Sequence, residues 1–451
     1  MRLAVVGGGW AGMAAAVAAA DAGIDVTVLE ATRQLGGRAR AMPSTRPDGV
    51  AVQLDNGQHI LIGAYSHCLA LMQRVGLDLP QVLTALPLAL PYPDGQGLQM
   101  PGWATRLPAP LDALVAIATA RGWTWGERLA LVRASLTWQR SGFVCAPSLT
   151  VSGLCSSLPQ RVMDELVEPL CVSALNLPAS QASAAVFLRV MRDALFGSRS
   201  GPWSASSLLL PRADLSALFP DAAARWLATT HPQASRVLTG ARVTTLLPMP
   251  NGWCLAGQRD GEAFDWAFDA VIWATGAAPA TRAMQEACNH APEATAVALR
   301  AWAHMAAALD FTAITTVYAW APGVRLTQPM LALRSRIGAP AQFVFDRGQL
   351  NSADPSTQGA LAFVISASEG ERETLEQSVL QQARDQLGLH HLQVIQTVVE
   401  KRATFACTPG LQRPEVAIAP RLWAAGDYVA GPYPATLEGA VRSGLDAVTR
   451  L

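Results

Sequence analysis

The sequence predicts an α/β fold built on a Rossmann-like unit, and two stretches near the N-terminus indicate it. Residues 3–6 form a short apolar run, followed by the glycine-rich loop 7–12 and by an Ala-rich stretch that Gly23 ends. Residues 26–29 form a second apolar run, and Glu30 stands at its tip. This order matches the strand, loop, helix and strand of a βαβ unit with a parallel sheet.

The loop has the spacing G-x-G-x-x-G, which is typical of dinucleotide-binding sites. Gly7 permits the tight turn, Gly9 lets a pyrophosphate approach the backbone, and Gly12 lets the helix pack on the strand. The helix starts at Trp10 and Ala11, where its free N–H groups face the phosphates. An ordinary glycine-rich turn is the alternative, but the register of strand, helix and acid favours a dinucleotide.

The residues after the second strand favour FAD over NAD. Glu30 is expected to accept hydrogen bonds from ribose hydroxyls. It is followed by a second permissive loop, Gly36 and Gly37, and by the cation Arg38, which is placed to neutralise phosphate charge. This extended signature resembles that of flavoprotein amine oxidases and carotenoid desaturases.

The C-terminal region predicts the flavin end of the site. A short apolar strand, residues 422–425, precedes Gly426 and Asp427, and the acid is expected to bind ribityl hydroxyls. Thr436 and Leu437 begin a helix whose positive end would stabilise negative charge on the reduced flavin.

A third region adds two weaker predictions. Residues 269–276 are expected to form a strand and a tight turn near the cofactor. The backbone around Val243, in a strand over residues 241–247, is expected to bind adenine, although a plain buried strand explains it nearly as well.

These cofactor segments are spread along the chain, so the predicted FAD-binding domain is discontinuous. It comprises residues 1–75, 205–285 and 405–451, and residues 76–204 and 286–404 form an inserted α+β substrate-binding domain. The 451 residues suffice for about two such domains.

The composition excludes several classes of function. The formal net charge is zero and like charges form no long run, which argues against nucleic acid as a partner. Seven scattered cysteines show no metal-binding spacing and suit reduced thiols in a cytoplasmic protein without a signal peptide.

Residues 83–143 are rich in leucine, tryptophan and arginine, with helices expected over 111–120 and 127–138. Such a segment suits an apolar substrate tunnel, a peripheral contact with the inner face of the cytoplasmic membrane, or an ordinary helical cap domain. The expected lipid contacts are Trp123 and Trp125.

The segment from Asp55 to His59 is the candidate for the flavin face. Gly57 and Gln58 are expected to contact the cofactor. His59 is the candidate proton donor, because histidine titrates near pH 7. A histidine held in a turn is the alternative, and Asp55 is interpreted as a turn-forming residue.

The chain resembles the hydroxysqualene dehydroxylases, also called squalene-associated FAD-dependent desaturases, of bacterial hopanoid pathways. The resemblance covers essentially the whole chain. It depends most on residues 54–61, 168–171, 208–212, 401–405 and 434–440. It implies that reduced FAD gives hydride to hydroxysqualene, that the substrate is a long isoprenoid, and that other squalene-pathway enzymes are neighbours.

Three other functions stay open. A carotenoid-type desaturase or isomerase would use the same FAD domain. An amine oxidase is disfavoured because the only lysine, Lys401, lies in a different motif from that family's flavin-site lysine. An FAD-stabilised scaffold is the non-catalytic alternative. No second glycine fingerprint for NAD(P)H occurs, so the source of electrons stays open.

Overall fold

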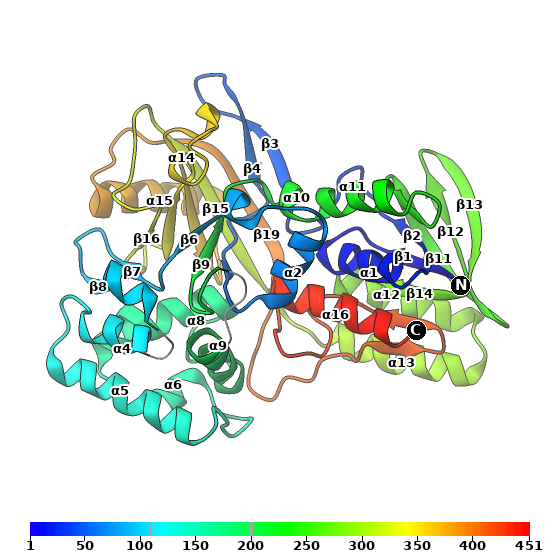
Figure 1. Ribbon diagram of the computed structural model, residues 1–451, viewed down its shortest axis with the longest axis horizontal. Helices are drawn as coiled ribbons and strands as arrows, with labels where there is room; N and C mark the ends of the chain where they lie inside the picture. Colours follow the sequence, from blue (N-terminus) through cyan, green and yellow to red (C-terminus); the bar gives the residue numbers. More distant parts are fainter. Residues whose placement is uncertain (108–110, 198–201) are drawn as a thin grey trace.

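The computed structural model describes residues 1–107, 111–197 and 202–451, and it shows two halves (Figure 1). One half contains both chain ends and a mostly parallel sheet between helices. The other half contains an antiparallel sheet and a group of helices. This arrangement confirms the predicted α/β fold with a Rossmann-like core.

The six-stranded sheet of the first half is parallel except at its last strand. Strand β1 pairs with β2 on one side and with β14 on the other, so that Val6 lies opposite both Leu29 and Trp273. The order of the strands is β10 (Ser235–Leu238), β2 (Asp25–Leu29), β1 (Arg2–Val6), β14 (Ala270–Trp273), β21 (Leu422–Ala424) and the antiparallel β20 (Ala417–Ala419).

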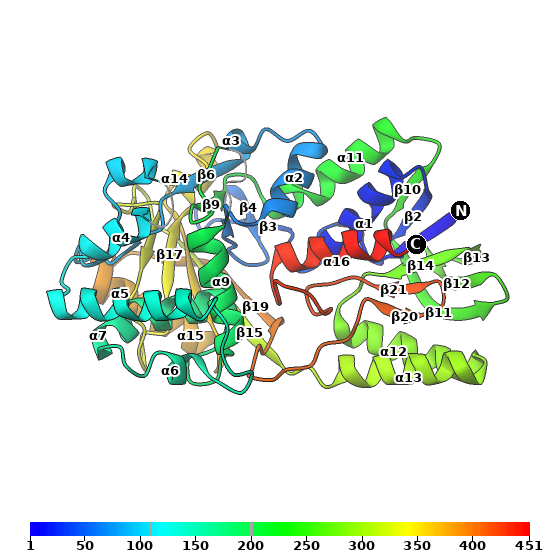
Figure 2. The same ribbon diagram turned by 60° about the horizontal axis from the view of Figure 1, so that its bottom comes forward.

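Helices cover both faces of this sheet (Figure 2). Helix α1 (Trp10–Asp21) is almost wholly buried because its short alanines let it pack between the sheet and its neighbours. Those neighbours are α11 (Pro220–Thr230) and α16 (Leu437–Thr449). The other face carries α12 (Ala277–Ala287), η3 (Cys288–His290), α13 (Glu293–Ala307) and the antiparallel meander β11 (Ala241–Met249), β12 (Gly252–Arg259) and β13 (Glu262–Phe268).

The second half is built on a five-stranded antiparallel sheet. One face is covered by α15 (Arg372–Leu387), whose Val379 packs with Phe363 in a separate apolar cluster. The opposite face contributes Tyr318 and Phe345 to the main core. The order is β16 (Met330–Ala332), β17 (Phe343–Asp346), β18 (Ala360–Ser366), β15 (Phe311–Trp320) and β19 (Gln393–Phe405); α14 (Arg347–Leu350) and η4 (Pro355–Thr357) link β17 to β18.

Helices form the outer layer of the second half (Figure 1). Helix α5 begins at Trp125, earlier than expected, because Thr124 and Glu127 form a capping box. The helices are η1 (Gly102–Arg106), α4 (Leu111–Ala118), α5 (Trp125–Arg140), α6 (Val151–Leu154), α7 (Gln160–Val162), the π-helical turn η2 (Met163–Val167), α8 (Glu168–Leu175) and α9 (Ala184–Phe196). In the described part of the chain, none of the helices has the length and apolarity needed to cross a bilayer.

Short strands and helices join the halves. The hairpin of β3 (Ala41–Thr45) and β4 (Ala51–Asp55) leads from the first half toward the second. Strand β9 (Leu208–Pro211) pairs with both β5 (Leu61–Ile62) and β6 (Leu83–Leu86). The remaining elements are α2 (Ser66–Arg74), α3 (Leu79–Val82), the β7 (Leu90–Pro91) and β8 (Gly97–Leu98) pair, and α10 (Leu215–Leu218).

The predicted domain boundaries stay a prediction, because packing does not show which segments fold independently. Helix α13 lies in the region assigned to the substrate domain, yet it packs on α12, and its Trp302 indole donates to the Glu415 carbonyl at 2.8 Å. The pairing of β6 with β9 likewise joins segments assigned to different domains.

Close packing of α16 on α1 generates a prediction about stability. A Cβ atom at Gly444 would lie 2.3 Å from the Ala11 carbonyl oxygen and 3.1 Å from the Ala15 nitrogen. We expect Gly444→Ala to push the helices apart and to destabilise the protein by about 1–3 kcal/mol. Thermal unfolding of purified protein measures this change.

The control is Gly126→Ala on α5, where the nearest neighbour of a new Cβ would be the Thr124 hydroxyl at 3.9 Å. That variant should be as stable as the parent or slightly more so, because alanine favours helix. Equal melting temperatures for both variants would contradict the close-packing argument.

Candidate cofactor site and substrate pocket

Two glycine loops meet at the carboxyl ends of β1 and β2. Gly9 and Gly36 form an isolated parallel bridge, and the Gly36 N–H donates to the Gly8 carbonyl at 2.9 Å. Gly36 and Gly37 both have positive φ angles, of 108° and 62°, which favour glycine. The structure therefore brings both predicted phosphate-binding loops to one place.

The glycines of the first loop have different reasons for lacking a side chain. A Cβ at Gly7 would lie 2.6 Å from the Ala274 carbonyl oxygen, and one at Gly12 would lie 1.9 Å from that of Gly7. A Cβ at Gly9 would meet only Gly37 Cα at 3.9 Å and the Gly36 oxygen at 4.0 Å. Internal packing requires glycine at Gly7 and Gly12, whereas Gly9 leaves an open cradle that suits a pyrophosphate.

Trp10 and Ala11 hold this loop in place from the first turn of α1. Both are buried, and the Trp10 indole packs in a tilted arrangement on the Phe219 ring, with the ring centroids 5.2 Å apart. The indole N–H of Trp10 also donates to the carbonyl of Ala39, which lies just beyond the second glycine loop, at 3.3 Å. The backbone amides of the helix start are thus held against both loops.

Glu30 lies at the end of β2, and its carboxylate ties the surrounding loops together. One oxygen accepts from the Gly8 N–H at 2.7 Å, and the other accepts from the Thr32 N–H and hydroxyl, both at 2.8 Å. The Ala241 N–H donates to the Glu30 carbonyl at 2.8 Å, which places the strand of Val243 beside the same site. Ribose and adenine contacts at Glu30 and Val243 stay predictions.

Arg38 connects the second glycine loop to the C-terminal segment. Its guanidinium forms an ion pair with Asp427 and donates to the Ala403 carbonyl at 2.5 Å. The Asn56 side chain donates to the Arg38 carbonyl at 3.1 Å. These contacts bring Arg38, Asp427 and the segment beginning at Asp55 together, although Asp427 lies far from the other two in the sequence.

Side-chain hydrogen bonds fix the start of α16, whose role at the flavin stays a prediction. The Thr436 hydroxyl caps the helix by accepting from the Gly439 N–H at 3.0 Å, and Leu437 is the first helical residue. The Gly426 N–H donates to the Ser443 hydroxyl at 2.8 Å, which fixes the Gly-Asp turn against the same helix.

Glu438 is a structural acid that the sequence did not identify. It is fully buried, and one carboxylate oxygen accepts from the His67 N–H at 3.1 Å and from Arg442 at 2.7 Å. The other oxygen accepts from the Cys68 N–H at 2.9 Å. Glu438 thus supplies acceptors for the first turn of α2 and binds that helix to α16.

His59 lies half-buried at the end of the segment that follows β4. Its Nδ1 atom lies 2.9 Å from the Gly57 carbonyl oxygen, so the neutral ring carries its proton on Nδ1 and presents Nε2 as an acceptor. Burial lowers the pKa of His59; the Gly57 hydrogen bond acts in the opposite direction, and the Arg38 charge lowers it further.

Asp55 is more than the turn-forming residue that the sequence suggested. Its side chain is buried, and one oxygen lies 3.1 Å from the Arg347 guanidinium of the second half. Gln58 accepts a hydrogen bond from the same Arg347 nitrogen at 3.2 Å. In the sequence, Arg347 is marked only by the isolated charges after the apolar residues 343–345, and these do not indicate which acid is its partner.

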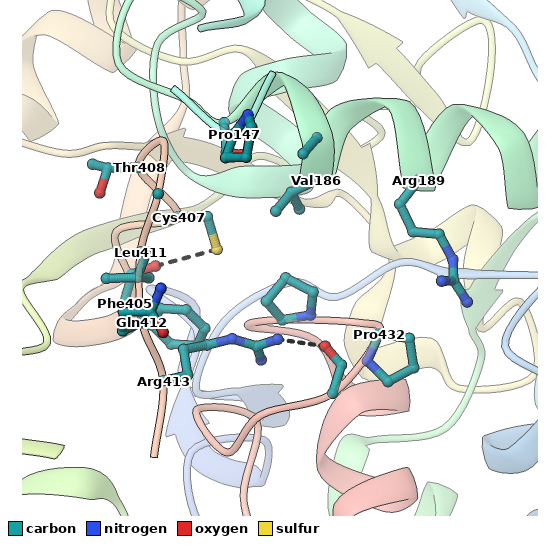
Figure 3. A pocket seen from close by; sticks show the side chains of 15 residues that line it. Pro147, Val186, Arg189, Phe405, Cys407, Thr408, Leu411, Gln412, Arg413 and Pro432 are labelled. Carbon is teal, nitrogen blue, oxygen red and sulfur yellow. Dashed lines mark hydrogen bonds between the residues drawn. The ribbon is translucent and has the colours of Figure 1, made fainter. Parts of the chain in front are cut away.

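A pocket of about 340 Å³ lies between α9, the end of β19 and the segment that precedes α16 (Figure 3). Val186 and Arg189 of α9 form one wall, and Phe405 at the end of β19 faces them. Arg413 lies over the Phe405 ring and donates to the Val429 carbonyl at 2.8 Å. Pro434, two residues before the cap of α16, also lines the pocket.

Comparison with known proteins agrees with this architecture. The family model described as flavin containing amine oxidoreductase matches residues 10–451. The chain belongs to the flavin-containing amine oxidoreductase family. Its cofactor is FAD. The open cradle at Gly9, the paired glycine loops and the capped start of α16 fit such an elongated dinucleotide.

Individual relatives differ in how much of the chain they match. A hydroxysqualene dehydroxylase of Rhodopseudomonas palustris is 28% identical over 455 residues, with 98% of this chain and 96% of the relative covered. A zeta-carotene desaturase of Synechocystis is 40% identical over only 76 residues, or 17% of this chain and 15% of the relative. An oxidoreductase structure from Methanosarcina mazei covers 100% of both chains with a TM-score of 0.72 at 15% identity, which shows the shared fold.

The contrast between Gly9 and Gly12 is testable. We expect Gly9→Ala to fold with less than about 1 kcal/mol of lost stability, since alanine is only a poorer N-cap, but to bind FAD more weakly because Cβ enters the cradle. Titration of the apoprotein with FAD measures this.

Gly12→Ala serves as the comparison, because its Cβ would clash with the Gly7 carbonyl. It should lower the melting temperature of the apoprotein itself. Unchanged FAD affinity in a folded Gly9→Ala protein would show that the phosphates do not pass Gly9.

Proposed function

We propose that this flavoprotein reduces hydroxysqualene to squalene, with the hydride coming from reduced FAD. The observation that carries the proposal is the match of nearly the whole chain to a hydroxysqualene dehydroxylase, substrate half included. The pocket beside Pro434 supports it, because its size lies in the range of small-molecule sites, about 300–1,000 Å³.

The reaction replaces an allylic hydroxyl by hydrogen. A proton must reach the leaving oxygen, so that the C–O bond breaks to release water, and a hydride must reach the same carbon. Reduced FAD supplies that hydride when bound. The chain's own task is to hold the carbon close, to provide the proton and to exclude water from the allylic cation.

The pocket walls suit the last of these tasks. Val186, Phe405 and Leu411 provide apolar surface. The Arg413 guanidinium donates hydrogen bonds to the Val429 and Gly431 carbonyls. An apolar isoprenoid chain would therefore contact these apolar side chains, while Arg189, which pairs with Asp193, leaves one part of the pocket wall polar. We propose that this pocket holds part of the substrate.

His59 is the proposed proton donor. With Nδ1–H held by Gly57, its Nε2 atom is the position that gains and releases the proton. The lowered pKa makes the protonated ring a stronger acid but a minority species at neutral pH. The proposal needs Nε2 to face the substrate oxygen.

Two alternatives use the same FAD half. A carotenoid-type desaturase or isomerase would act on a polyene and, as a desaturase, would transfer hydride in the opposite direction. Amine oxidation is less favoured, because Lys401 is exposed on β19 rather than at the site. An FAD-stabilised scaffold, and contact with neighbouring squalene-pathway enzymes, stay predictions.

The decisive experiment is anaerobic. The bound flavin is reduced chemically, hydroxysqualene is added, and flavin absorbance and squalene are followed together. We expect reoxidation with one squalene formed per flavin. Oxidised enzyme that is instead reduced by phytoene would favour the desaturase, and flavin indifferent to both substrates would favour the scaffold.

The His59 assignment predicts a pH dependence. A general acid must be protonated, so turnover should fall as pH rises through a pKa below the usual histidine value. His59→Gln should retain FAD, lose about 10²–10⁴-fold in turnover and lose this dependence. Turnover is measured under the anaerobic conditions above.

His290, exposed at the end of η3, provides the matched control. The variant His290→Gln should keep the parent profile. If His59→Gln also keeps parental turnover, His59 has no part in proton transfer.

We also propose a peripheral membrane contact on α5. Trp125, Leu129 and Leu136 are 75%, 47% and 42% exposed, and with Arg133 and Arg140 they follow one helical stripe. Apolar side chains interleaved with arginines suit an anionic lipid surface, from which an isoprenoid would be drawn. The helix lies at the outer edge of the molecule (Figure 2).

The structure corrects one residue of the expected contact. Trp123 is only 5% exposed, and its indole donates to Glu165 at 2.9 Å, so it belongs to the core. Its burial leaves Trp125 as the lipid-facing tryptophan of the two.

Liposome co-sedimentation tests the contact. Trp125→Ala should weaken binding to vesicles containing phosphatidylglycerol several-fold, because an exposed aromatic is lost from the interface. The control Val297→Ala removes an apolar side chain, 52% exposed, from α13 in the other half. Equal binding by both variants would rule out α5 as the contact.

A further inference from the structure

The segment that carries His59 is held by a buried ion pair between the two halves of the molecule. Asp55 at the end of β4 is 1% exposed, and Arg347 at the start of α14 is 4% exposed. Their side chains lie 3.1 Å apart, although 292 residues separate them in the sequence. The second Asp55 oxygen accepts from the Leu215 N–H at 2.8 Å.

The same guanidinium nitrogen also reaches the next part of the segment. It lies 3.2 Å from the Gln58 side-chain oxygen, and the Gln58 amide donates to the His59 carbonyl at 3.3 Å. Arg347 therefore links a fixed carboxylate to the residue that precedes His59.

Strand β15 holds the segment at Tyr318 and lies close to it at Thr316. The Tyr318 hydroxyl donates to the Asp55 carbonyl at 3.0 Å. Thr316 lies two residues away, and its hydroxyl would be 3.9 Å from a Cβ at Gly57. That hydroxyl is buried and has no hydrogen-bond partner within the described residues. Gly57 in turn accepts from the His59 ring, so the imidazole orientation follows this backbone.

Stability alone gives no reason for such a pair. Burial raises the pKa of the Asp55 carboxyl to about 6, against the effects of Arg347 and of the Leu215 N–H. Removing two charges from water costs free energy that their attraction often fails to recover, and well-packed apolar side chains in their place are often neutral or stabilising. What the ion pair provides, and apolar packing would not, is a fixed position for Gln58 and for the backbone next to His59.

We propose that Asp55 and Arg347 are positioning residues that hold Gln58 and His59 at the flavin edge. The proposal rests on the proposed location of this segment beside FAD. The two residues act through Gln58 and the backbone of Gly57, and neither needs to touch the substrate. Because Arg347 belongs to the second half, the pair also makes the orientation of His59 depend on how the halves meet.

The test compares variants that separate charge balance from geometry. Asp55→Leu/Arg347→Leu removes both charges and leaves no buried ion without a partner. Arg347→Lys keeps the charge, but the lysine side chain is one bond shorter, so its ammonium does not reach the position of the guanidinium nitrogen that contacts both Asp55 and Gln58. Each is purified with FAD and examined by thermal unfolding, by visible circular dichroism of the flavin and by anaerobic turnover.

We expect both variants to keep FAD and Arg347→Lys to unfold near the parent temperature, whereas the double variant should unfold somewhat lower because the buried Leu215 N–H loses its Asp55 acceptor. The visible circular dichroism should change, kcat should fall about 10- to 100-fold, and KM should stay within about threefold, since misplacement affects the reacting geometry more than binding. Arg74→Met, which breaks the exposed pair of Arg74 with Asp21, should leave all these properties unchanged.

A flavin spectrum and kcat equal to the parent in either folded variant would overturn the proposal and reduce the pair to a structural contact. If the double variant fails to fold, Arg347→Lys decides the question by the same criteria. The flavin spectrum needs no substrate, so it still tests the positioning role if hydroxysqualene proves not to be the substrate.

Discussion

The whole cofactor site depends on how closely α1 approaches the strands beneath it. The space at Gly12 is so narrow that a single Cβ would lie 1.9 Å from the Gly7 carbonyl. This approach points the N-terminus of α1 at the cradle of Gly9 and Gly36. On its other side α1 packs equally closely against α16 at Gly444, and Thr436 caps the start of α16. The absence of side chains at Gly12 and Gly444 therefore sets the relative positions of α1, α16 and the first glycine loop.

Charged side chains then bind the loops of the site to this frame. Glu30 fixes the first glycine loop through Gly8, Arg38 joins the second loop to Asp427, and Glu438 holds α2 on α16. Each is partnered by backbone groups or by a side chain distant in sequence. Such bonds stabilise one loop geometry, because a buried charge that loses its partner is costly.

Local patterns explain why the fold and the cofactor were predictable from the sequence. The glycine spacing, Glu30 and the Ala-rich helix express short-range requirements of a βαβ unit, so they can be recognised within 30 residues of chain. The start of α5 was missed by two residues because the Thr124–Glu127 capping box was overlooked. Trp123 and Trp125 are neighbours in sequence with similar composition around them, and only the position of Glu165 makes the first a core residue.

The sequence by itself determined the cofactor class and the residues of its loops, since these depend on backbone freedom at particular glycines. Tertiary structure alone decided that Asp55 meets Arg347 and that α9 and the end of β19 enclose a pocket. It also decided that Pro434, just before α16, lines that pocket. The physical reason is range: a turn or helix start is specified by neighbours, whereas the partner of a buried charge is chosen by the packing of two halves of the chain.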